Sequence, residues 1–309
     1  MSAMRKRGSP GARHLRARLL KRGLALAVSS GLLPALIAIA IASSSAPAHA
    51  RPLDDVVSSK VLRVVVYDDN APYSWTDADG TVKGIDADLA RAVAGRMGVQ
   101  AEIIARTAGE EVDDDLRSNI WQGPRTGGVV GDVMMHVPME REFIARNNLV
   151  AISNAYQHEK IVLVVHPDMV DPAKGLSAFR SAKLAVQFAT TAHYYAMFAD
   201  AETLKPNVNP FRKLKSAVAS FLSRQNAGIL AVRSELESLL AADLAAVRLI
   251  EPQFDTHLRM AWTIGTAVKH DSRDTGYAFG NALREIETSG ELAAIFTKYG
   301  VTRVPPPVP

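Results

Sequence analysis

VLRVVVY, residues 61–67, is an almost unbroken run of apolar and β-branched residues, and it predicts a buried β-strand. Residues 86–98 follow with apolar side chains at helical spacing, and Asp86 stands where it could cap that helix. Further strands are expected at 101–105 and 131–137, with a second helix between them. Strands that alternate with helices in this way indicate an open α/β sheet.

A second and smaller α/β series begins near residue 161. The chain then returns to a strand expected at 260–268 and to two helices expected at 275–288 and 291–299. We therefore expect an α/β protein built from two units. The second series consists of strands expected at 161–165, 183–186, 228–232 and 247–250, with helices expected around 194–198, 215–223 and 234–242.

The first 50 residues differ from the rest of the chain. They carry eight basic residues and no acidic ones, continue with an apolar run over 23–42, and end in Ala48-His49-Ala50. A basic segment, an apolar segment and a small-x-small end are typical of a secretory signal peptide. We therefore expect residues 1–50 to direct the protein to the periplasm and to be cut off after Ala50. An uncleaved membrane anchor is the alternative, because the apolar run is long.

The composition of the remaining chain indicates a soluble globular protein. The formal net charge of the full sequence is +4, and it becomes −4 once the eight basic residues of the N-terminal segment are removed. A chain of this charge has no basic bias, so we expect no nucleic-acid partner. The sequence contains no Cys, which excludes both disulfides and a lipid-anchored Cys. No stable membrane insertion is expected after cleavage.

Sequence patterns of catalytic and metal sites are missing. The His residues do not cluster as zinc ligands do, and residues 123–128 lack the Lys-Ser/Thr ending of a phosphate-binding loop. The sequence has no nucleophile elbow and no Cys nucleophile. An acidic run at 110–115 could hold a hard cation, although such runs are more often solvated loops and helix starts. We predict no enzyme, no cofactor and no metal site.

Four stretches of the chain, in their order and spacing, carry a family resemblance. They are Leu62 to Val99, with Ala71-Pro-Tyr-Ser-Trp75 and Gly84-Ile-Asp-Ala-Asp-Leu89; Gly131-Asp-Val-Met-Met-His-Val-Pro138; Lys183-Leu-Ala-Val-Gln-Phe-Ala-Thr-Thr191; and Trp262-Thr-Ile-Gly-Thr-Ala-Val268. With these stretches the chain resembles the family 3 periplasmic solute-binding proteins, which are best known as polar amino-acid receptors of ABC importers.

The resemblance implies a type II periplasmic binding protein fold. Two lobes are joined by two crossing hinge segments, and the ligand is bound in the cleft between them. Lobe 1 would combine residues 60–156 with 255–303, and lobe 2 would be residues 157–254. Residues 304–309 would be a loose Pro-rich tail, and the protein is expected to be a monomer.

Matching positions place several candidate ligand-binding residues in lobe 1. Asn70, Tyr73 and Trp75 follow the first strand, where the family uses an aromatic residue to cover the ligand. The alternative is that one of the two rings belongs to the core. His136 stands at the end of the third strand, where it could donate to an anion or sense pH. It could equally be a half-buried His whose partners are backbone groups.

Three further sites concern a ligand carboxylate. Thr190 and Thr191 lie between a strand and a helix, where the family contacts the carboxylate, although a plain N-cap is the alternative. Arg141 matches an Arg that clamps the carboxylate, but the segment before it is shorter than usual, so it could be a surface cation. Arg233 stands where amino-acid receptors usually have an Asp for the ligand ammonium. An Arg there favours an organic anion, unless the alignment is shifted by one residue.

The resemblance leaves three functional hypotheses. The first is a receptor that delivers a small polar solute to an ABC permease. Thr190, Thr191, Arg141 and Arg233 favour a carboxylated solute. The second follows from Asp132-Val-Met-Met-His-Val-Pro138, which resembles a pattern in solute-binding-like proteins associated with periplasmic quinoprotein alcohol dehydrogenases. In that case the partner is the dehydrogenase. The third is a dehydratase that uses a cleft carboxylate as acid or base.

Overall fold

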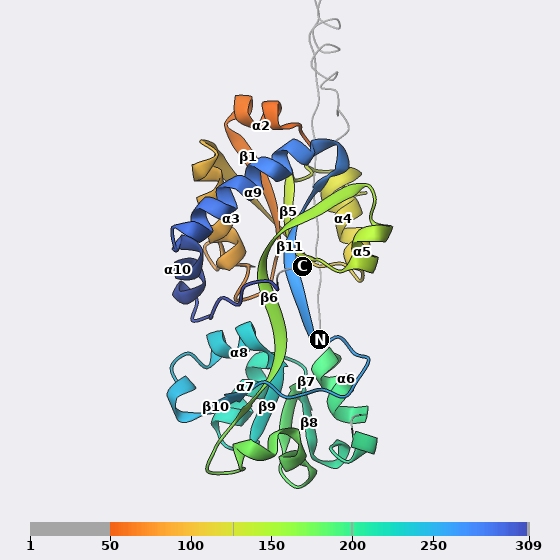
Figure 1. Cartoon of the computed structure of the whole chain (residues 1–309), viewed down its shortest axis with the longest axis vertical. Coiled ribbons are helices and arrows are strands. Elements are labelled where there is room, and N and C mark those ends of the chain that lie inside the picture. Colours follow the sequence, from red (N-terminus) through yellow and green to blue (C-terminus); the bar gives the residue numbers. More distant parts are fainter. Residues whose placement is uncertain (1–49, 126, 199, 308–309) are drawn as a thin grey trace, which may run out of the picture. The chain divides into compact units, whose positions relative to one another are not determined.

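The computed structural model describes residues 50–125, 127–198 and 200–307. The predicted signal peptide therefore lies outside the described residues, apart from Ala50. Most described strands form one continuous sheet in the order β4-β1-β5-β11-β6-β9-β7-β8, and β10 pairs with β6 (Figure 1). In the part of the chain that the structure describes, no helix is both long and apolar enough to span a bilayer.

The first half of this sheet is built on the predicted strand. β1 (Val61–Tyr67) lies between β4 (Gln100–Arg106) and β5 (Val133–Pro138) and is parallel to both. β11 (Ala261–Lys269) is antiparallel to β5, with Ile264 opposite Pro138. The beginning of β11 therefore lies beside the carboxyl end of β5. This arrangement brings side chains from distant parts of the sequence to one edge of the sheet.

A single long strand connects the two halves of the sheet. β6 (Val150–Val165) pairs with β11 over its first part and with β9 and β10 over its last part. The sequence predicted a strand only from residue 161 onward, because residues 153–160 are mostly polar and show no simple apolar alternation. The backbone hydrogen bonds to β11 hold this polar half of β6 in the extended conformation.

The second half of the sheet contains four short strands, which alternate with helices. β7 and β9 are parallel, as are β7 and β8, whereas β6 runs antiparallel to β9. The elements are β7 (Leu184–Gln187), β8 (Val208–Phe211), β9 (Gly228–Val232), β10 (Arg248–Ile250), α6 (Thr191–Phe198), α7 (Leu214–Leu222) and α8 (Arg233–Leu239).

Helices of the first half cover both sheet faces, and short 3-10 turns complete the chain. The helices are α2 (Leu53–Ser59), α3 (Ile85–Arg96), α4 (Val112–Leu116), α5 (Arg141–Arg146), α9 (Arg273–Thr288) and α10 (Glu291–Lys298), with a π-helical turn at Arg117–Trp121. A two-stranded ribbon is formed by β2 (Trp75–Thr76) and β3 (Val82–Lys83). The 3-10 turns are Pro172–Arg180, Asp200–Glu202, Lys205–Asn207, Leu244–Ala246 and His270–Ser272.

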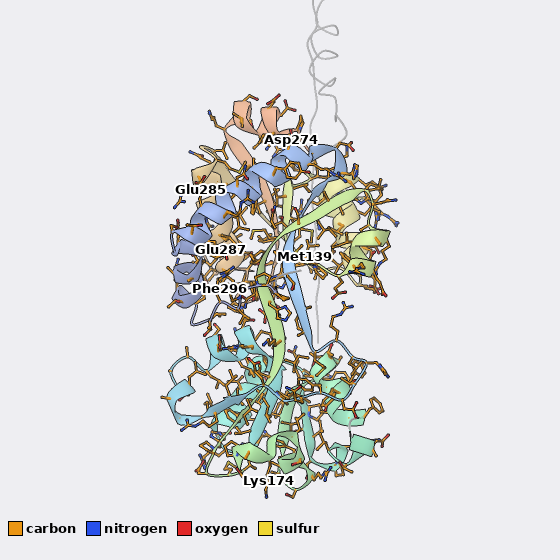
Figure 2. All side chains as sticks on the ribbon, in the orientation of Figure 1. Met139, Lys174, Asp274, Glu285, Glu287 and Phe296 are labelled. Atoms are coloured by element: carbon orange, nitrogen blue, oxygen red, sulfur yellow. The ribbon has the colours of Figure 1, made fainter. Side chains whose placement is uncertain are left out.

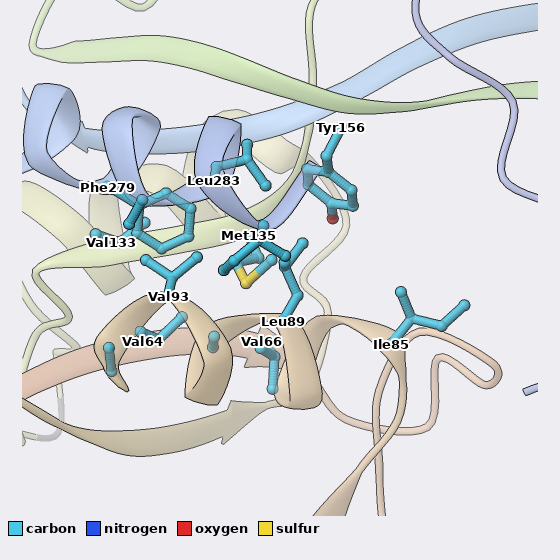
Figure 3. Close-up of a cluster of buried hydrophobic side chains, with 14 of the residues drawn as sticks. Val64, Val66, Ile85, Leu89, Val93, Val133, Met135, Tyr156, Phe279 and Leu283 are labelled. Carbon is cyan, nitrogen blue, oxygen red and sulfur yellow. The ribbon is translucent and has the colours of Figure 1, made fainter. Parts of the chain in front are cut away.

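The buried side chains separate into clusters that follow the two halves of the sheet. In the first half, Leu89 and Val93 of α3 pack with Phe279 of α9 over β1 and β5 (Figure 3). Burial of each such side chain stabilises the fold by about 1.5–3 kcal/mol. Glu285 and Glu287 of α9 are exposed (Figure 2). Two other clusters contain only residues between 161 and 260.

Two details of the sequence prediction are wrong. Asp86 does not cap α3, because the helix begins at Ile85 after Gly84 and the Asp86 side chain is completely buried. Val304 is not part of a loose tail, since its N–H donates to Gln157 Oε1 at 2.9 Å and its carbonyl accepts from His158 N–H at 2.9 Å. These bonds fasten the last described segment to the middle of β6.

Candidate functional site

A pocket of about 350 Å³ opens at the carboxyl edge of the first half of the sheet. In open α/β sheets this edge is where ligands bind, and the volume is in the usual range for small-molecule sites. The pocket collects residues at the ends of β1 and β5, residues that follow β1 and β4, and the beginning of β11. We call it the β1 pocket. It is lined by Tyr67, Asp68, Asp69, Asn70, Ala108, Gly109, Glu110, Val112, Asp115, His136, Pro138, Trp262 and Ile264.

Hydrogen-bond acceptors dominate the polar lining of the β1 pocket. Its ionisable acids are Asp68, Asp69, Glu110 and Asp115, and none of the lining residues, all of which the structure describes, is Lys or Arg. Asp68 accepts from the N–H of Thr76 at 2.9 Å, and hydrogen bonds with Thr76 lower the pKa of its carboxyl group. A pocket with this lining favours a ligand that brings N–H donors and positive charge.

Asp115 is the buried acid of the pocket, and two protein donors hold it. Tyr67 donates its hydroxyl to Asp115 Oδ2 at 2.8 Å, and Gly109 donates its N–H to Oδ1 at 2.9 Å. Burial and the neighbouring carboxylate raise the pKa of Tyr67, so its hydroxyl stays protonated and remains a donor. The rigid Tyr67–Asp115 pair fixes the shape of the pocket wall.

His136 is held by a buried network behind the pocket. Its Nδ1 lies 3.3 Å from Oδ2 of Asp86, and Tyr156 donates its hydroxyl to the other oxygen of Asp86 at 2.7 Å. The backbone N–H of His136 donates to the Tyr156 hydroxyl at 3.1 Å.

The backbone of His136 lies in the left-handed region, with φ 61°. For a residue other than glycine this conformation costs about 1 kcal/mol. The bonds to Tyr156 and the Asp86 contact offset that cost, and the Tyr73 ring packs edge-on to the imidazole with centroids 4.4 Å apart. Strained residues of this kind are concentrated at binding and active sites.

A second pocket, of about 410 Å³, lies between residues that follow β1 and residues at the ligand edge of the second half. Asp69 lines both pockets. In contrast to the β1 pocket, this one contains three cations: Arg212 and Lys213 between β8 and α7, and Lys215 in the first turn of α7. We call these three residues the basic rim. Gln187, at the end of β7, and Glu235, on α8, also line this second pocket.

Of the residues predicted after the first strand, Asn70 and His136 line the β1 pocket, whereas Tyr73 and Trp75 do not. Asn70 has a buried side-chain nitrogen without a hydrogen-bond partner among the described residues, which suits a ligand contact. Tyr73 is 3% exposed and hydrogen bonds to Glu159, so it belongs to the core. Trp75 packs edge-on against Tyr299, with ring centroids 5.8 Å apart, on the β2–β3 ribbon.

Arg233 is already neutralised by protein carboxylates. Its Nε lies 2.8 Å from Glu237 Oε1 and its Nη1 lies 3.0 Å from Glu251 Oε1. An Arg with two such partners has little attraction left for a ligand anion. Arg141 is the exposed first residue of α5 and lines neither pocket. These contacts therefore do not favour an organic anion as a ligand of Arg233.

Thr190 has the geometry of the N-cap alternative. Its hydroxyl donates to Gln187 O at 2.7 Å and accepts from His193 N–H at 3.3 Å. Thr191 is the first residue of α6, and neither Thr lines the two pockets. Phe188, between β7 and α6, is 57% exposed.

Sequence reasoning did not assign the charged residues that line the two pockets to ligand binding. Asp68 and Asp69 directly follow the predicted strand, a position that could have identified them. The basic rim could not be found in this way, because β8 was not predicted. Trp262 was quoted only as part of a family stretch, and its place in the pocket depends on the pairing of β11 with β5.

Comparison with known proteins confirms the predicted resemblance and the fold. Residues 62–121 match the family model of bacterial extracellular solute-binding proteins, family 3. No curated protein sequence matches the chain. Over residues 62–121, therefore, the chain is related to family 3 solute-binding proteins.

Solved structures similar to this chain cover most of its length. An ancestral cationic amino acid solute-binding protein is 22% identical, with a TM-score of 0.62 over 80% of this chain and 98% of that one. A polar amino acid ABC transporter substrate-binding protein from Streptococcus thermophilus is 17% identical, with a TM-score of 0.63 over 82% of this chain and 90% of that one. The L-cystine receptor of Neisseria gonorrhoeae, in its unliganded open conformation, is 18% identical, with a TM-score of 0.60 over 83% of this chain and 100% of that one. The fold is thus the two-lobed type II periplasmic binding protein fold, as predicted.

Proposed function

We propose that this protein is a periplasmic receptor that captures a small polar solute and delivers it to an ABC importer. The observation that carries the proposal is the charge division at the ligand edge. The β1 pocket presents acceptors and carboxylates, and the basic rim presents three cations. A zwitterion with an additional donor group, such as an amino acid with a cationic side chain, complements both surfaces. The predicted carboxylate of the solute is retained, but its partner becomes the basic rim.

Each surface would recognise a different end of the ligand. Asp68 and Asp69 follow the same strand and offer two carboxylates to one donor group, whereas the unpartnered side-chain nitrogen of Asn70 can donate to an acceptor of the ligand. At the other end, Arg212 can bind a carboxylate through two parallel N–H···O bonds. Asp69 lines both pockets, so we assign it the ammonium nearest the middle of the ligand.

We propose the lobe boundaries inferred from the sequence, 60–156 with 255–303 and 157–254. One buried cluster, with residues between 162 and 247, lies entirely within 157–254 and supports them; another has residues between 161 and 230 and also Met260, which lies just beyond that boundary. β6 and the segment that leads into β11 would then be the crossing hinges. Closure about these hinges would bring the basic rim toward the β1 pocket.

A binding role without turnover is favoured over the dehydratase alternative. Asp115 is the buried acid in the β1 pocket, and its two oxygens are already engaged by Tyr67 and Gly109. A general acid or base needs a free oxygen directed at the substrate. One similar structure, 23% identical, is described as an ancestral amino acid-binding protein that preceded cyclohexadienyl dehydratase. The partnership with a quinoprotein dehydrogenase stays a prediction, tested by copurification.

A thermal-shift screen tests the proposed function. The full-length chain, produced for export and purified, is mixed with amino acids, dicarboxylates, sugar acids, phosphate esters, and calcium or lanthanide ions. A ligand at 100 times its Kd stabilises the folded state by about 2.7 kcal/mol, which raises the melting temperature. We expect L-arginine or L-lysine to give the largest shift. A response to dicarboxylates alone, or to metal ions alone, would refute the proposal.

Asp69→Asn tests the pocket assignment with little risk to the fold. Asp69 has φ 57°, a conformation that Asn tolerates as well as Asp. Loss of a charge-assisted hydrogen bond worth about 1.5–3 kcal/mol should weaken the Kd roughly 10- to 100-fold. The matched control is Asp79→Asn in the exposed turn between β2 and β3, which should leave the Kd unchanged. Arg233→Ala should change the Kd by no more than about threefold. A larger increase in Kd would show that Arg233 contributes to ligand binding.

A further inference from the structure

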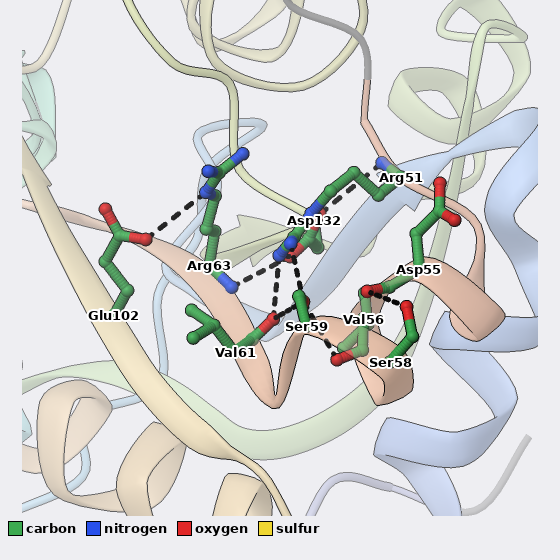
Figure 4. Close-up of polar contacts among 9 residues, drawn as sticks. All are labelled: Arg51, Asp55, Val56, Ser58, Ser59, Val61, Arg63, Glu102 and Asp132. Atoms are coloured by element: carbon green, nitrogen blue, oxygen red, sulfur yellow. Dashed lines mark hydrogen bonds and ion pairs between the residues drawn. The ribbon is translucent and has the colours of Figure 1, made fainter.

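A buried carboxylate holds the first described residues against the amino edge of the sheet. Asp132 directly precedes β5, and its side chain is 1% exposed. Arg51 binds it through two parallel bonds, with Nε 3.1 Å from Oδ1 and Nη2 2.6 Å from Oδ2 (Figure 4). The backbone N–H of Arg63 on β1 donates to the same Oδ2 at 2.8 Å. Asp132 is thus a desolvated acceptor in a fixed position.

The remaining donors of Arg51 fix its position as well. Nη1 donates to Ser59 Oγ at 2.9 Å, and Nη2 also donates to the carbonyl of Val61 at 2.7 Å. With the side chain anchored at three places, the backbone nitrogen of Arg51 comes to 3.4 Å from Asp132 Oδ1. In an intact chain that nitrogen is an amide and carries no charge.

Cleavage after Ala50 would change the chemistry of this nitrogen. Hydrolysis adds the hydroxyl of water to the carbonyl carbon of Ala50 and a proton to the nitrogen of Arg51. The new α-amine takes up a second proton below its pKa, ordinarily about 7.7–8.0. We propose that Asp132 is the binding site for the α-ammonium group of Arg51, so that removal of the signal segment adds an ion pair that stabilises the folded protein. This inference rests on the proposed export.

Two observations bear on when cleavage occurs relative to folding and on whether the ion pair depends on ligand binding. Ala50 is 7% exposed, so the bond after it is covered once the chain has folded, and cleavage must come first. Asp132 lies at the amino end of β5, whereas the β1 pocket lies at the carboxyl ends of the parallel strands β1 and β5. The ion pair can therefore form whether or not a ligand binds.

The first part of the test identifies the N-terminus. The full-length chain is produced for export, and the purified protein is analysed by intact mass and N-terminal peptide mapping. We expect Arg51 as the first residue. An intact chain, or a chain that begins at any other residue, overturns the proposal.

The second part measures the contribution of the new amine. The processed protein is acetylated selectively at the α-amine, and thermal unfolding of both forms is compared at pH 7. We expect acetylation to lower the melting temperature by about 2–4 °C, as the loss of roughly 1 kcal/mol does in a protein of this size. In Asp132→Asn the same acetylation should have almost no effect. The matched control is Glu291→Gln, which removes an exposed partner of Arg96 and should leave the acetylation effect intact.

A pH series decides the question if Asp132→Asn fails to fold. An ion pair raises the pKa of the amine in the folded state, so its stabilisation is present below the unfolded pKa and is lost as pH rises through the folded value. The other charges that interact with Arg51 are Glu102 and Asp55, and Arg63 lies beside Asp132. The difference between free and acetylated forms should vanish at about pH 10. A difference that persists at high pH, or none at pH 7, refutes the ion pair. Acetylation should not change the ligand response, so failure of the proposed receptor function is distinguishable.

Discussion

Single residues shape the carboxyl edge of the first half of the sheet through their backbone conformation. Asp69 and His136, which line the β1 pocket, have φ of 57° and 61°, and Gly84, which precedes α3, has φ of 118°. At Asp69 and His136 the side chain is needed at the pocket, and hydrogen bonds or packing hold the conformation. At Gly84 no side chain can be accommodated, because a Cβ atom would lie 2.2 Å from the carbonyl oxygen of Tyr73.

Gly84→Ala should therefore destabilise the protein far more than an Ala at an open turn. The clash is with backbone, which cannot move aside cheaply, so we expect a loss of about 3 kcal/mol or more in the free energy of unfolding. Gly80→Ala is the matched control, since φ is 81° there and nothing lies within 4 Å of the added Cβ. It should cost about 1 kcal/mol. Chemical denaturation measures both, and equal losses would contradict the packing described here.

The site residues show which positions can be predicted from the sequence and which depend on tertiary contacts. Asn70, predicted as a ligand-binding residue from its place after β1, lines the β1 pocket, and its role in binding stays a prediction. Tyr73 and Trp75 follow the same strand, but Tyr73 is buried in the core and Trp75, on β2, packs against Tyr299. The partners of Arg233 could not be predicted, because Glu251 lies 18 residues away in the chain and approaches only through the pairing of β10 with β6.

At the scale of elements, β6 is the strand that both lobes share, and it contains a buried acid. Glu159 is 1% exposed and accepts a hydrogen bond from Tyr73 of the first half. Burial is the main cause that raises the pKa of Glu159 to about 7. The charges of Glu235 and Glu237 act in the same direction, and hydrogen bonding to Ser234 lowers the pKa. Burial also raises the pKa of Glu235 to about 7.

Stability should consequently fall between about pH 5 and pH 7.5. A carboxyl group whose pKa is higher in the folded state favours folding while it is protonated, and this advantage is lost as pH rises through the folded pKa. From 4.5 to about 7, the difference for Glu159 amounts to at most about 3 kcal/mol. Glu159→Gln should remove much of this slope and raise the melting temperature at pH 8 relative to the wild type. Glu102→Gln, an exposed control, should not; an unchanged slope in Glu159→Gln would contradict the account.

Elements with a clear apolar pattern were predicted well, and the others were not. β1, β4 and β9 agree with the expected strands to within one residue at each end. β8 (Val208–Phe211) contains Asn209 and Pro210, and α5 is only six residues long, so neither has a pattern that a sequence can display. Their positions are set by tertiary contacts: β8 pairs in parallel with β7, and Phe143 of α5 is buried in the core.

For the whole molecule, the order of the segments predicted two α/β units, and the resemblance of four stretches to family 3 solute-binding proteins implied the two-lobed fold. The ligand chemistry was not predictable in the same way. The acids of the β1 pocket and the basic rim lie on different halves of the sheet, and even Asp115 and Arg212 are 97 positions apart in the chain. Charges that meet only in the folded protein cannot be paired from a single sequence.

The most direct test of the account is a calorimetric titration of the purified exported protein with three matched ligands: L-lysine, cadaverine and glutarate. L-Lysine carries both ammonium groups and a carboxylate, cadaverine lacks the carboxylate, and glutarate lacks the ammonium groups. We expect L-lysine to bind, and each of the other two to bind at least about 30-fold more weakly, because one of the two surfaces loses its partner. Binding of glutarate as tight as that of L-lysine would contradict the assignment of the β1 pocket to a cation and return the argument to an anion receptor.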